Sequence, residues 1–173
     1  MRGYLLDTNI IAFWSDPCRH EHDSVLRRID NLERLAPLAT SAIVLGEMEY
    51  GYMAAPEGRR EAVSQIILFA RTQLPWILEI TSSTAEVYGS LRAKLFDRYV
   101  PKGKSRNGLR PCQLIDPVTS LGLGIQENDL WIAAQALEYN LVLVTHDKMD
   151  HIRTVAPELT LEDWADTDDQ TDR

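Results

Sequence analysis

Four acidic residues stand at positions from which their carboxylates could meet: Asp7, Glu47, Asp129 and Asp147. Two of them follow apolar runs that are predicted to be strands, and the other two lie among apolar residues at helical spacing. Acidic side chains are rarely buried, so acids on inward faces require a partner. Carboxylates gathered at one point would raise one another's pKa values unless a cation shares the site. An all-oxygen ligand set suits Mg²⁺ or Mn²⁺ rather than zinc, and a metal held in this way can activate a water and neutralise charge on a phosphodiester.

The segment from Glu127 to Asp147 would position two of these acids. Four apolar residues follow Asp129 on one face of a predicted helix: Ile132, Ala133, Ala136 and Leu137. The uniformly apolar run over 141–144 then predicts a central parallel strand that is covered on both sides. Thr145 and Asp147 follow at its carboxyl end, where open α/β sheets bind their ligands.

Hydrophobic periodicity divides the rest of the chain into alternating strands and helices. Besides the run at 141–144, strands are predicted over 4–6, 38–40, 76–80 and 159–161. Helices are predicted from 8 to the proline at 17, over 22–35, 41–54, 60–73 and 83–99, from near 127, and over 148–155. This alternation specifies an α/β fold, a three-layer α/β/α sandwich with a mainly parallel central sheet. We expect one domain over residues 1–164 and an acidic, disordered tail over 165–173.

The predicted helix at 41–54 carries Glu47 inside an apolar stripe. Three residues share that stripe: Ile43, Tyr50 and Ala54. We expect the stripe to face the interior, and Tyr50 to lie in the core or in an interface. Three further apolar side chains near the first helices exceed what one small core needs: Ile10, Trp14 and Tyr52.

The stretch from 100 to 126 loses its periodicity and is rich in glycine and proline, so it is predicted to be a long loop. Four basic residues lie in it: Lys102, Lys104, Arg106 and Arg110. Because the loop ends where the helix that carries Asp129 begins, we expect it at the mouth of the acidic cleft. Its positive charge would there offset the repulsion that a nucleic acid meets from four carboxylates. A solvated loop fits the same composition equally well.

Charge and composition exclude several classes of protein. The 173 residues carry a formal net charge of −8, which argues against a purely electrostatic nucleic-acid binder. Six acids and one base between Glu162 and Arg173 supply −5 of that charge. No apolar stretch approaches the roughly 20 residues of a membrane span. Cys18 and Cys112 lie far apart in no ligand-like spacing, which favours free thiols in a reducing cytoplasm.

Four motifs occur in order along the chain: Leu6-Asp7-Thr8-Asn9, Ser41 with Glu47 and Gly51, Asn128 to Ala134, and Leu143 to Asp147. Together they resemble the PIN domain family, and more narrowly the VapC-type toxins of bacterial toxin–antitoxin pairs. The resemblance runs from Tyr4 to Trp164. The family commonly has a phenylalanine after the last acid, whereas this chain has Asp150 and His151, so we expect different packing under that helix.

The resemblance implies a PIN-like fold and an endoribonuclease that hydrolyses RNA phosphodiester bonds with Mg²⁺, or with Mn²⁺ as a substitute. The four acids would be both the metal ligands and the catalytic residues. Asn9, Thr145 and the four basic loop residues are assigned to substrate binding. The implied partners are an RNA, such as a transfer RNA or another structured RNA, and a cognate antitoxin. A homodimer in the cytoplasm is also expected.

Two other classes of protein fit part of the pattern. A phospho-aspartate phosphatase or receiver would use Asp7 as its nucleophile. Asn9, however, stands where such phosphatases have a second acid, and no lysine ends a predicted strand. A non-catalytic RNA-binding module on the same fold would use the loop to hold RNA. The presence of all four acids in one chain speaks against it, and an activity assay would decide.

Overall fold

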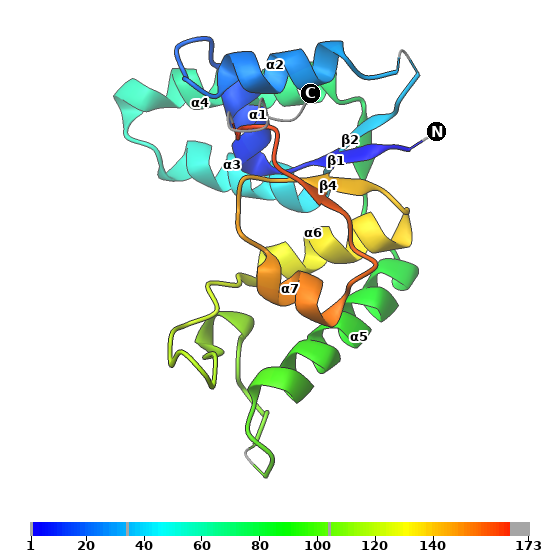
Figure 1. Cartoon of the computed structure of the whole chain (residues 1–173). Helices are drawn as coiled ribbons and strands as arrows, with labels where there is room; N and C mark the ends of the chain where they lie inside the picture. Colours follow the sequence, from blue (N-terminus) through cyan, green and yellow to red (C-terminus); the bar gives the residue numbers. More distant parts are fainter. Residues whose placement is uncertain (1, 34, 104, 167–173) are drawn as a thin grey trace.

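A parallel sheet of five strands forms the centre of the computed structural model, which describes residues 2–33, 35–103 and 105–166 (Figure 1). The strands are β1 (Tyr4–Leu6), β2 (Leu38–Ser41), β3 (Trp76–Leu78), β4 (Val142–Val144) and β5 (Leu161–Glu162). Their order across the sheet is β3-β2-β1-β4-β5, and every pairing is parallel. All of β4 is buried, as expected for a strand with helices on both faces.

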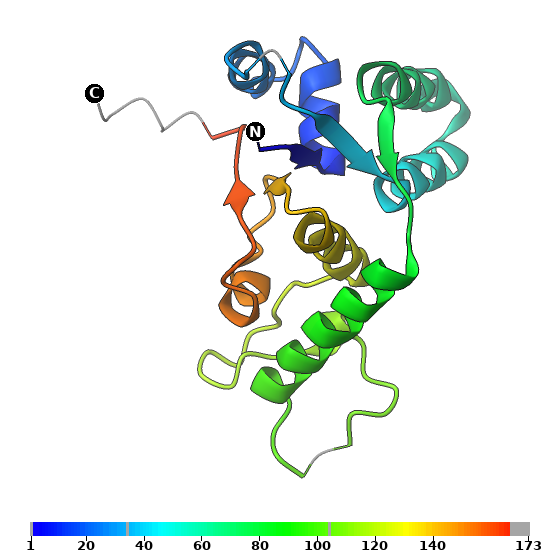
Figure 2. The same ribbon diagram turned by 90° about the vertical axis from the view of Figure 1, so that its right-hand side faces the viewer.

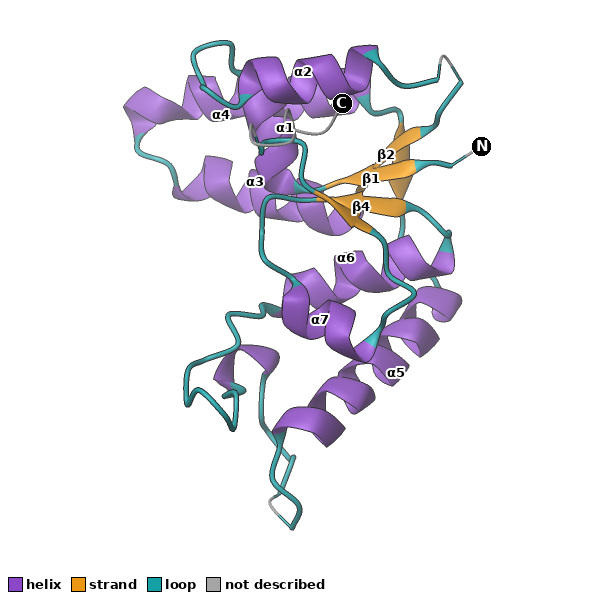
Figure 3. Cartoon of the chain, in the orientation of Figure 1, coloured by secondary structure: helices purple, strands orange, loops and turns teal. Residues whose placement is uncertain are grey.

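Within these residues, seven α-helices cover the two faces of the sheet (Figures 1 and 3). One layer holds α1 (Thr8–Ser15), α2 (His22–Asp30), α3 (Ala42–Ala54) and α4 (Glu57–Gln73). The other holds α5 (Ser82–Tyr99), α6 (Glu127–Glu138) and α7 (Asp150–Val155). Figure 2 shows the two layers from a second direction, with the sheet between them. The predicted three-layer α/β/α fold is thus confirmed.

Several predicted element ends were wrong, each for a local reason. The helix α4 begins at Glu57 rather than at 60, because Pro56 has a φ of −55° that suits a helix start. The helix α2 ends at Asp30 rather than at 35, because the next N–H already closes the final turn on two preceding carbonyls. The strand β5 begins only at 161, because Leu159 instead closes a turn on Ala156. Smaller shifts occur where β3 ends at 78, β4 begins at 142 and α7 begins at 150.

The last described segment returns to the body of the molecule, as predicted for Trp164. Its side chain is 1% exposed, and its ring centroid lies 5.2 Å from that of Tyr4. The indole N–H donates to a carboxylate oxygen of Glu162 at 2.8 Å. The expected acidic tail lies, from residue 167 onward, outside the described residues.

The three side chains that suggested an interface belong to the core instead. Ile10 is fully buried, Trp14 packs edge-on against Phe69 with ring centroids 4.9 Å apart, and Tyr52 packs against the buried cluster. The argument for a dimer from these residues was therefore wrong. Large exposed apolar side chains occur elsewhere, among them Tyr50, Met53, Leu68, Val118 and Leu121. None of the described helices is both long and apolar enough to cross a bilayer.

The predicted loop consists of two parts. The first part is described over residues 100–103 and 105–110, and it begins beyond the end of α5, away from the sheet (Figures 1 and 2). The second part, residues 111–126, contains a 3₁₀ turn at Pro111–Gln113 and a β-bridge between Ile115 and Gly122. Three apolar side chains fix this second part to the core: Leu114, Leu123 and Ile125.

Two side chains of the segment after Asp147 are buried: Met149, just before α7, and Ile152 within it. His151 makes a polar contact instead, with its Nδ1 2.8 Å from the hydroxyl of Tyr99. The expected difference from the family's packing under this helix stays a prediction.

Candidate active site

Asp7 and Asp147 lie at the same edge of the sheet. The strands β1 and β4 are neighbours, with Leu6 paired to Val144, and the Asp7 N–H donates to the Val144 carbonyl at 3.0 Å. The carboxyl ends of parallel strands meet at one edge. Two acids from opposite ends of the chain therefore come close together.

Thr145 and Asn9 hold these two acids in place. The Thr145 hydroxyl donates to Asp7 Oδ2 at 2.8 Å and accepts from the Asp147 N–H at 3.1 Å. Asn9 Nδ2 donates to Asp147 Oδ2 at 3.0 Å, and Asn9 Oδ1 accepts from the His146 N–H at 3.1 Å. Both residues were predicted to bind substrate. Their polar groups are engaged within the protein, which fits a positioning role better.

Glu47 reaches the same region from α3. Its Oε2 accepts from the Thr8 hydroxyl at 2.6 Å, and its Oε1 accepts from Asn128 Nδ2 at 2.8 Å. Thr8 is the first residue of α1, and Asn128 lies in the first turn of α6. Glu47 therefore connects three helices beside the edge of the sheet.

Asp129 turns toward the start of its own helix. Its Oδ2 accepts from the Gln126 N–H at 2.7 Å and so caps α6. Its pKa is nevertheless raised from 3.8 to about 6. Burial contributes most to that shift, the bond from Gln126 opposes it, and the charges of Asp7, Asp147 and Glu47 add to it. Because charge repulsion weakens with distance, Asp129 must face the same region as the other three acids.

Asp7 is the most buried of the four acids, with 5% of its surface exposed. Its pKa is raised from 3.8 to about 6, chiefly by burial. Hydrogen bonds from the Thr145 hydroxyl and the Thr8 N–H lower the pKa, and the charges of Glu47 and Asp147 contribute to the rise. Two such acids in one cleft are unfavourable at neutral pH, and a cation between them would remove that cost.

The chemistry of the donors fits a hard divalent cation, since four carboxylates face one region. Within the described part of the chain, however, no three acid, histidine or cysteine side chains are arranged as a metal site. Protein donors hold the carboxylates instead, as Gln126 holds Asp129 and Asn128 holds Glu47. These carboxylate oxygens have lone pairs left beside the hydrogen bonds, so the same donors can orient the acids around a cation.

The apolar stripe that contains Glu47 does not face the interior, contrary to prediction. The buried residues of α3 are Val44, Leu45 and Met48, on another side of the helix. Tyr50, which was expected in the core or an interface, is 75% exposed. The stripe was misjudged because α3 has two apolar sides and only one of them makes core contacts. Glu47 thus lies beside solvent-exposed apolar groups.

Lys102, Arg106 and Arg110 are exposed. Within the described part of the chain, no hydrogen bond or ion pair joins these three residues to the four acids. Arg106 forms an ion pair with Asp97 at 2.6 Å. Lys104 lies outside the described residues. A role of these four residues in substrate binding stays a prediction.

Sequence analysis missed the contacts of Thr8 and Asn128 with Glu47. Each residue stands directly beside an acid in one of the four motifs, which indicated that it lies near the site. The sequence did not indicate that Glu47 is its hydrogen-bond partner. The hydroxyl of Thr8 donates to Glu47, which lies 39 positions away, and not to the neighbouring Asp7.

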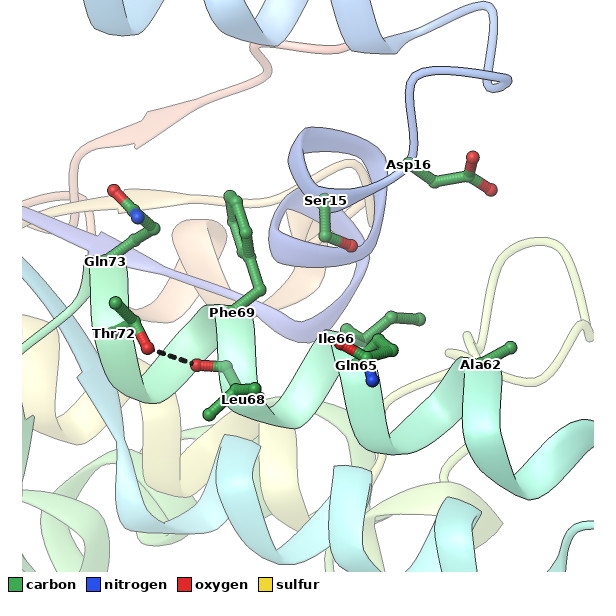
Figure 4. A pocket seen from close by; sticks show the side chains of 9 residues that line it. All are labelled: Ser15, Asp16, Ala62, Gln65, Ile66, Leu68, Phe69, Thr72 and Gln73. Carbon is green, nitrogen blue, oxygen red and sulfur yellow. Dashed lines mark hydrogen bonds between the residues drawn. The ribbon is translucent and has the colours of Figure 1, made fainter.

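A second surface hollow lies apart from the acids, between the end of α1 and one side of α4 (Figure 4). Its volume is about 520 Å³, and apolar side chains of Ile66, Leu68 and Phe69 contribute to its wall. Asp16 is the one carboxylate that lines it among the described residues, and it lies 3.9 Å from Arg19. The hollow therefore lacks a set of metal ligands, and the chemistry belongs to the sheet edge.

Comparison with known proteins agrees with this geometry. The PIN domain family model matches residues 4–156. Ribonuclease VapC2 of Rickettsia felis is 27% identical over 161 residues, which cover 93% of this chain and 97% of that protein. The VapBC2 structure from Rickettsia felis, bound to a promoter DNA fragment, superposes with a TM-score of 0.66 at 26% identity over 93% of this chain and 98% of that one. VapBC-1 of nontypeable Haemophilus influenzae shares the fold with a TM-score of 0.65 at 23% identity over 94% and 98% of the two chains.

Proposed function

Because the chain belongs to the PIN domain family, we propose that it is a metal-dependent endoribonuclease and the toxin of a toxin–antitoxin pair. The observation that carries the proposal is the convergence of Asp7, Glu47, Asp129 and Asp147 at one edge of the sheet, where burial, with a smaller contribution from the neighbouring acids, raises the pKa values of Asp7 and Asp129. The similarity to Ribonuclease VapC2 supports RNA as the substrate.

The four acids would hold Mg²⁺, or Mn²⁺ in its place, because hard cations prefer carboxylate oxygens. When bound, such a cation lowers the pKa of water and neutralises charge on a phosphodiester. The products expected from hydrolysis are a 5′-phosphate and a 3′-hydroxyl.

The other residues of the site position the acids. The hydroxyl of Thr145 and the amide of Asn9 fix the two strand-end carboxylates relative to each other. Thr8 and Asn128 fix Glu47 from two different helices. Such outer contacts orient metal ligands and commonly matter nearly as much as the ligands themselves.

Cleavage of RNA with and without metal tests the proposal. The protein should cut RNA in Mg²⁺ or Mn²⁺, lose activity in EDTA, and fail to recover with Zn²⁺. Asp7→Asn should be inactive, whereas Asp23→Asn, which changes an exposed acid on α2, should behave as the parent. Full activity in EDTA would refute metal dependence.

A non-catalytic RNA-binding module is the remaining alternative. It would bind RNA without cutting it under any metal condition, which the same assay detects. The phospho-aspartate phosphatase and receiver classes are excluded by the family membership.

The proposed partners follow from the relatives. VapBC2 and VapBC-1 are toxin–antitoxin complexes, so we expect a cognate antitoxin for this chain, together with a homodimer. Cys18 and Cys112 are free and exposed, as predicted. Free thiols and an RNA substrate are both consistent with the cytoplasm.

A further inference from the structure

A hollow of about 540 Å³ adjoins the acidic site on the side of α3. Five lining residues come from α3 and one from the first turn of α6: Ala42, Ile43, Gly46, Glu47, Tyr50 and Asn128. Glu47 belongs both to this hollow and to the acids at the sheet edge. A ligand held at the acids would therefore extend directly into the hollow.

The walls of the hollow are apolar and partly aromatic. Ile43 and Ala42 form one side, and Tyr50 is 75% exposed although a tyrosine ring would normally bury most of its surface. A side chain added at Gly46 would meet no atom within 4 Å, so this glycine leaves the hollow open. An open apolar surface with an exposed aromatic ring suits a flat apolar ligand.

Asn128 supplies the polar edge of the hollow. One of its amide hydrogens is donated to Glu47 Oε1 at 2.8 Å. Its second amide hydrogen and its Oδ1 make no hydrogen bond to any residue that the structure describes. An amide with a free donor and a free acceptor can pair with the edge of a nucleobase.

We propose that this hollow binds one unpaired base of the RNA, next to the phosphate that is cut, with Tyr50 stacking on the base and Asn128 pairing with its edge. The proposal rests on the proposed ribonuclease function and names the part of the substrate that the site recognises. A phosphate does not fit here, because the lining includes the Glu47 carboxylate and no cation. Unstacked bases in single-stranded RNA are recognised in this way, on aromatic faces and through their edges.

The RNA must therefore be single-stranded at the cleavage site, as in a loop or a bulge, since a paired base cannot enter the hollow. Fully duplex RNA is expected to be resistant. The protein's preference among bases is set by Asn128 and by the depth that Gly46 leaves open.

The first test compares variants on a short oligoribonucleotide that the parent protein cuts at one site. Tyr50→Ala should raise KM about ten-fold with little change in kcat, because an aromatic platform contributes mainly to binding of the base. Tyr50→Phe keeps the ring and should restore the parent KM. Met53→Ala removes another exposed side chain of α3 outside the hollow and is the matched control.

The second test fills the hollow. Gly46→Leu should raise KM in the same way as Tyr50→Ala. Gly51→Leu is the matched control, because Gly51 lies in the same helix, also faces open space and does not line the hollow. Thermal unfolding of all variants checks that the fold is retained.

The third test removes the base from the RNA. Two oligoribonucleotides are used, each of which lacks the base on one side of the cut. On one of the two, the parent and Tyr50→Ala should have the same KM.

Three outcomes would count against the proposal. If Tyr50→Ala and Gly46→Leu both keep the parent KM on intact RNA, the base site is refuted and the ribonuclease function stands. If the parent cuts no RNA at all, the function itself fails. If Tyr50→Ala changes the oligomeric state in light scattering and its defect persists on both base-free RNAs, Tyr50 belongs to a protein interface instead, which also overturns the proposal.

Discussion

Asp7 is the most deeply buried of the four acids, and its pKa is about 6 although the Thr145 hydroxyl and the Thr8 N–H donate to it. At neutral pH its negative charge therefore opposes folding when no cation is present. Asp7→Asn keeps the size and an acceptor oxygen but removes the charge. We expect it to increase the free energy of unfolding of the metal-free protein by up to about 3 kcal/mol at neutral pH.

Urea denaturation in EDTA measures this effect. An Asp7→Asn variant that is less stable than the parent would show that the aspartate has a structural role. The same variant should lose RNA cleavage, so that stability and activity change in opposite directions. Asp23→Asn is again the control.

The raised pKa values also predict how stability depends on pH. The folded pKa values of Asp7 and Asp129, both about 6, lie above the ordinary 3.8. Their contribution to stability is then fully present below pH 3.8 and is lost as the pH rises through 6. The metal-free parent should therefore gain stability from this pair as the pH falls from neutral toward 4. Asp7→Asn should show a smaller gain in the same denaturation series. An equal gain in both proteins would contradict the assignment.

Thr145 is the residue whose hydroxyl joins the two strand-end acids. Thr145→Val preserves the shape of this buried side chain and removes the hydroxyl. We expect activity at saturating RNA to fall about 10- to 100-fold, the range found for outer contacts of metal ligands. Thr145→Ser keeps the hydroxyl and should retain most of the activity. Equal activity of the two variants would show that the hydroxyl has no positioning role.

At the level of helices and strands, α6 and β4 could be predicted because each has an unambiguous apolar pattern. The pattern of α6 is a single apolar face at helical spacing, and that of β4 is a uniformly apolar run. The helix α3 could not be oriented in the same way, since Ile43 and Tyr50 offered an apolar stripe as plausible as the one that is buried. Its true orientation depends on contacts with α1 and α4 that no local pattern encodes. The hydrogen bonds of Thr8 and Asn128 were unpredictable for the same reason.

The loop between α5 and α6 shows a second limit of pattern analysis. Its length and basic composition were evident, but its course depends on where Leu114, Leu123 and Ile125 find space in the core. Figure 2 shows the start of the loop beyond the end of α5, on the side away from the sheet.

The position of the loop leads to different predictions for long and for short RNA substrates. Changing Lys102, Lys104, Arg106 and Arg110 to alanine should weaken binding of a long structured RNA and reduce the salt dependence of that binding. A short oligoribonucleotide that reaches only the acids should be cut as fast as by the parent protein. Equal binding of the long RNA by both proteins at every salt concentration would show that the loop is merely solvated.

For the molecule as a whole, the exposed apolar side chains predict association. Met53 and Leu68 are each more than half exposed, on the adjacent helices α3 and α4. Exposed apolar surface of this kind commonly marks a protein interface. We expect a homodimer in light scattering at micromolar concentration. A monomer at every concentration tested would contradict this expectation.

The order of the strands determines when, during synthesis, the candidate site can form. Among the strands that the structure describes, β1 is made first, yet it lies at the centre of the sheet and pairs with β4. Asp7 therefore cannot meet Thr145 and Asp147 until β4 has been synthesised, and Asp129 is made only shortly before β4. A growing chain cannot assemble the four acids before residue 147 has emerged from the ribosome. Under the proposed function, the nascent polypeptide would be unable to cut RNA until that point, and a cognate antitoxin would find a complete site to bind only after it.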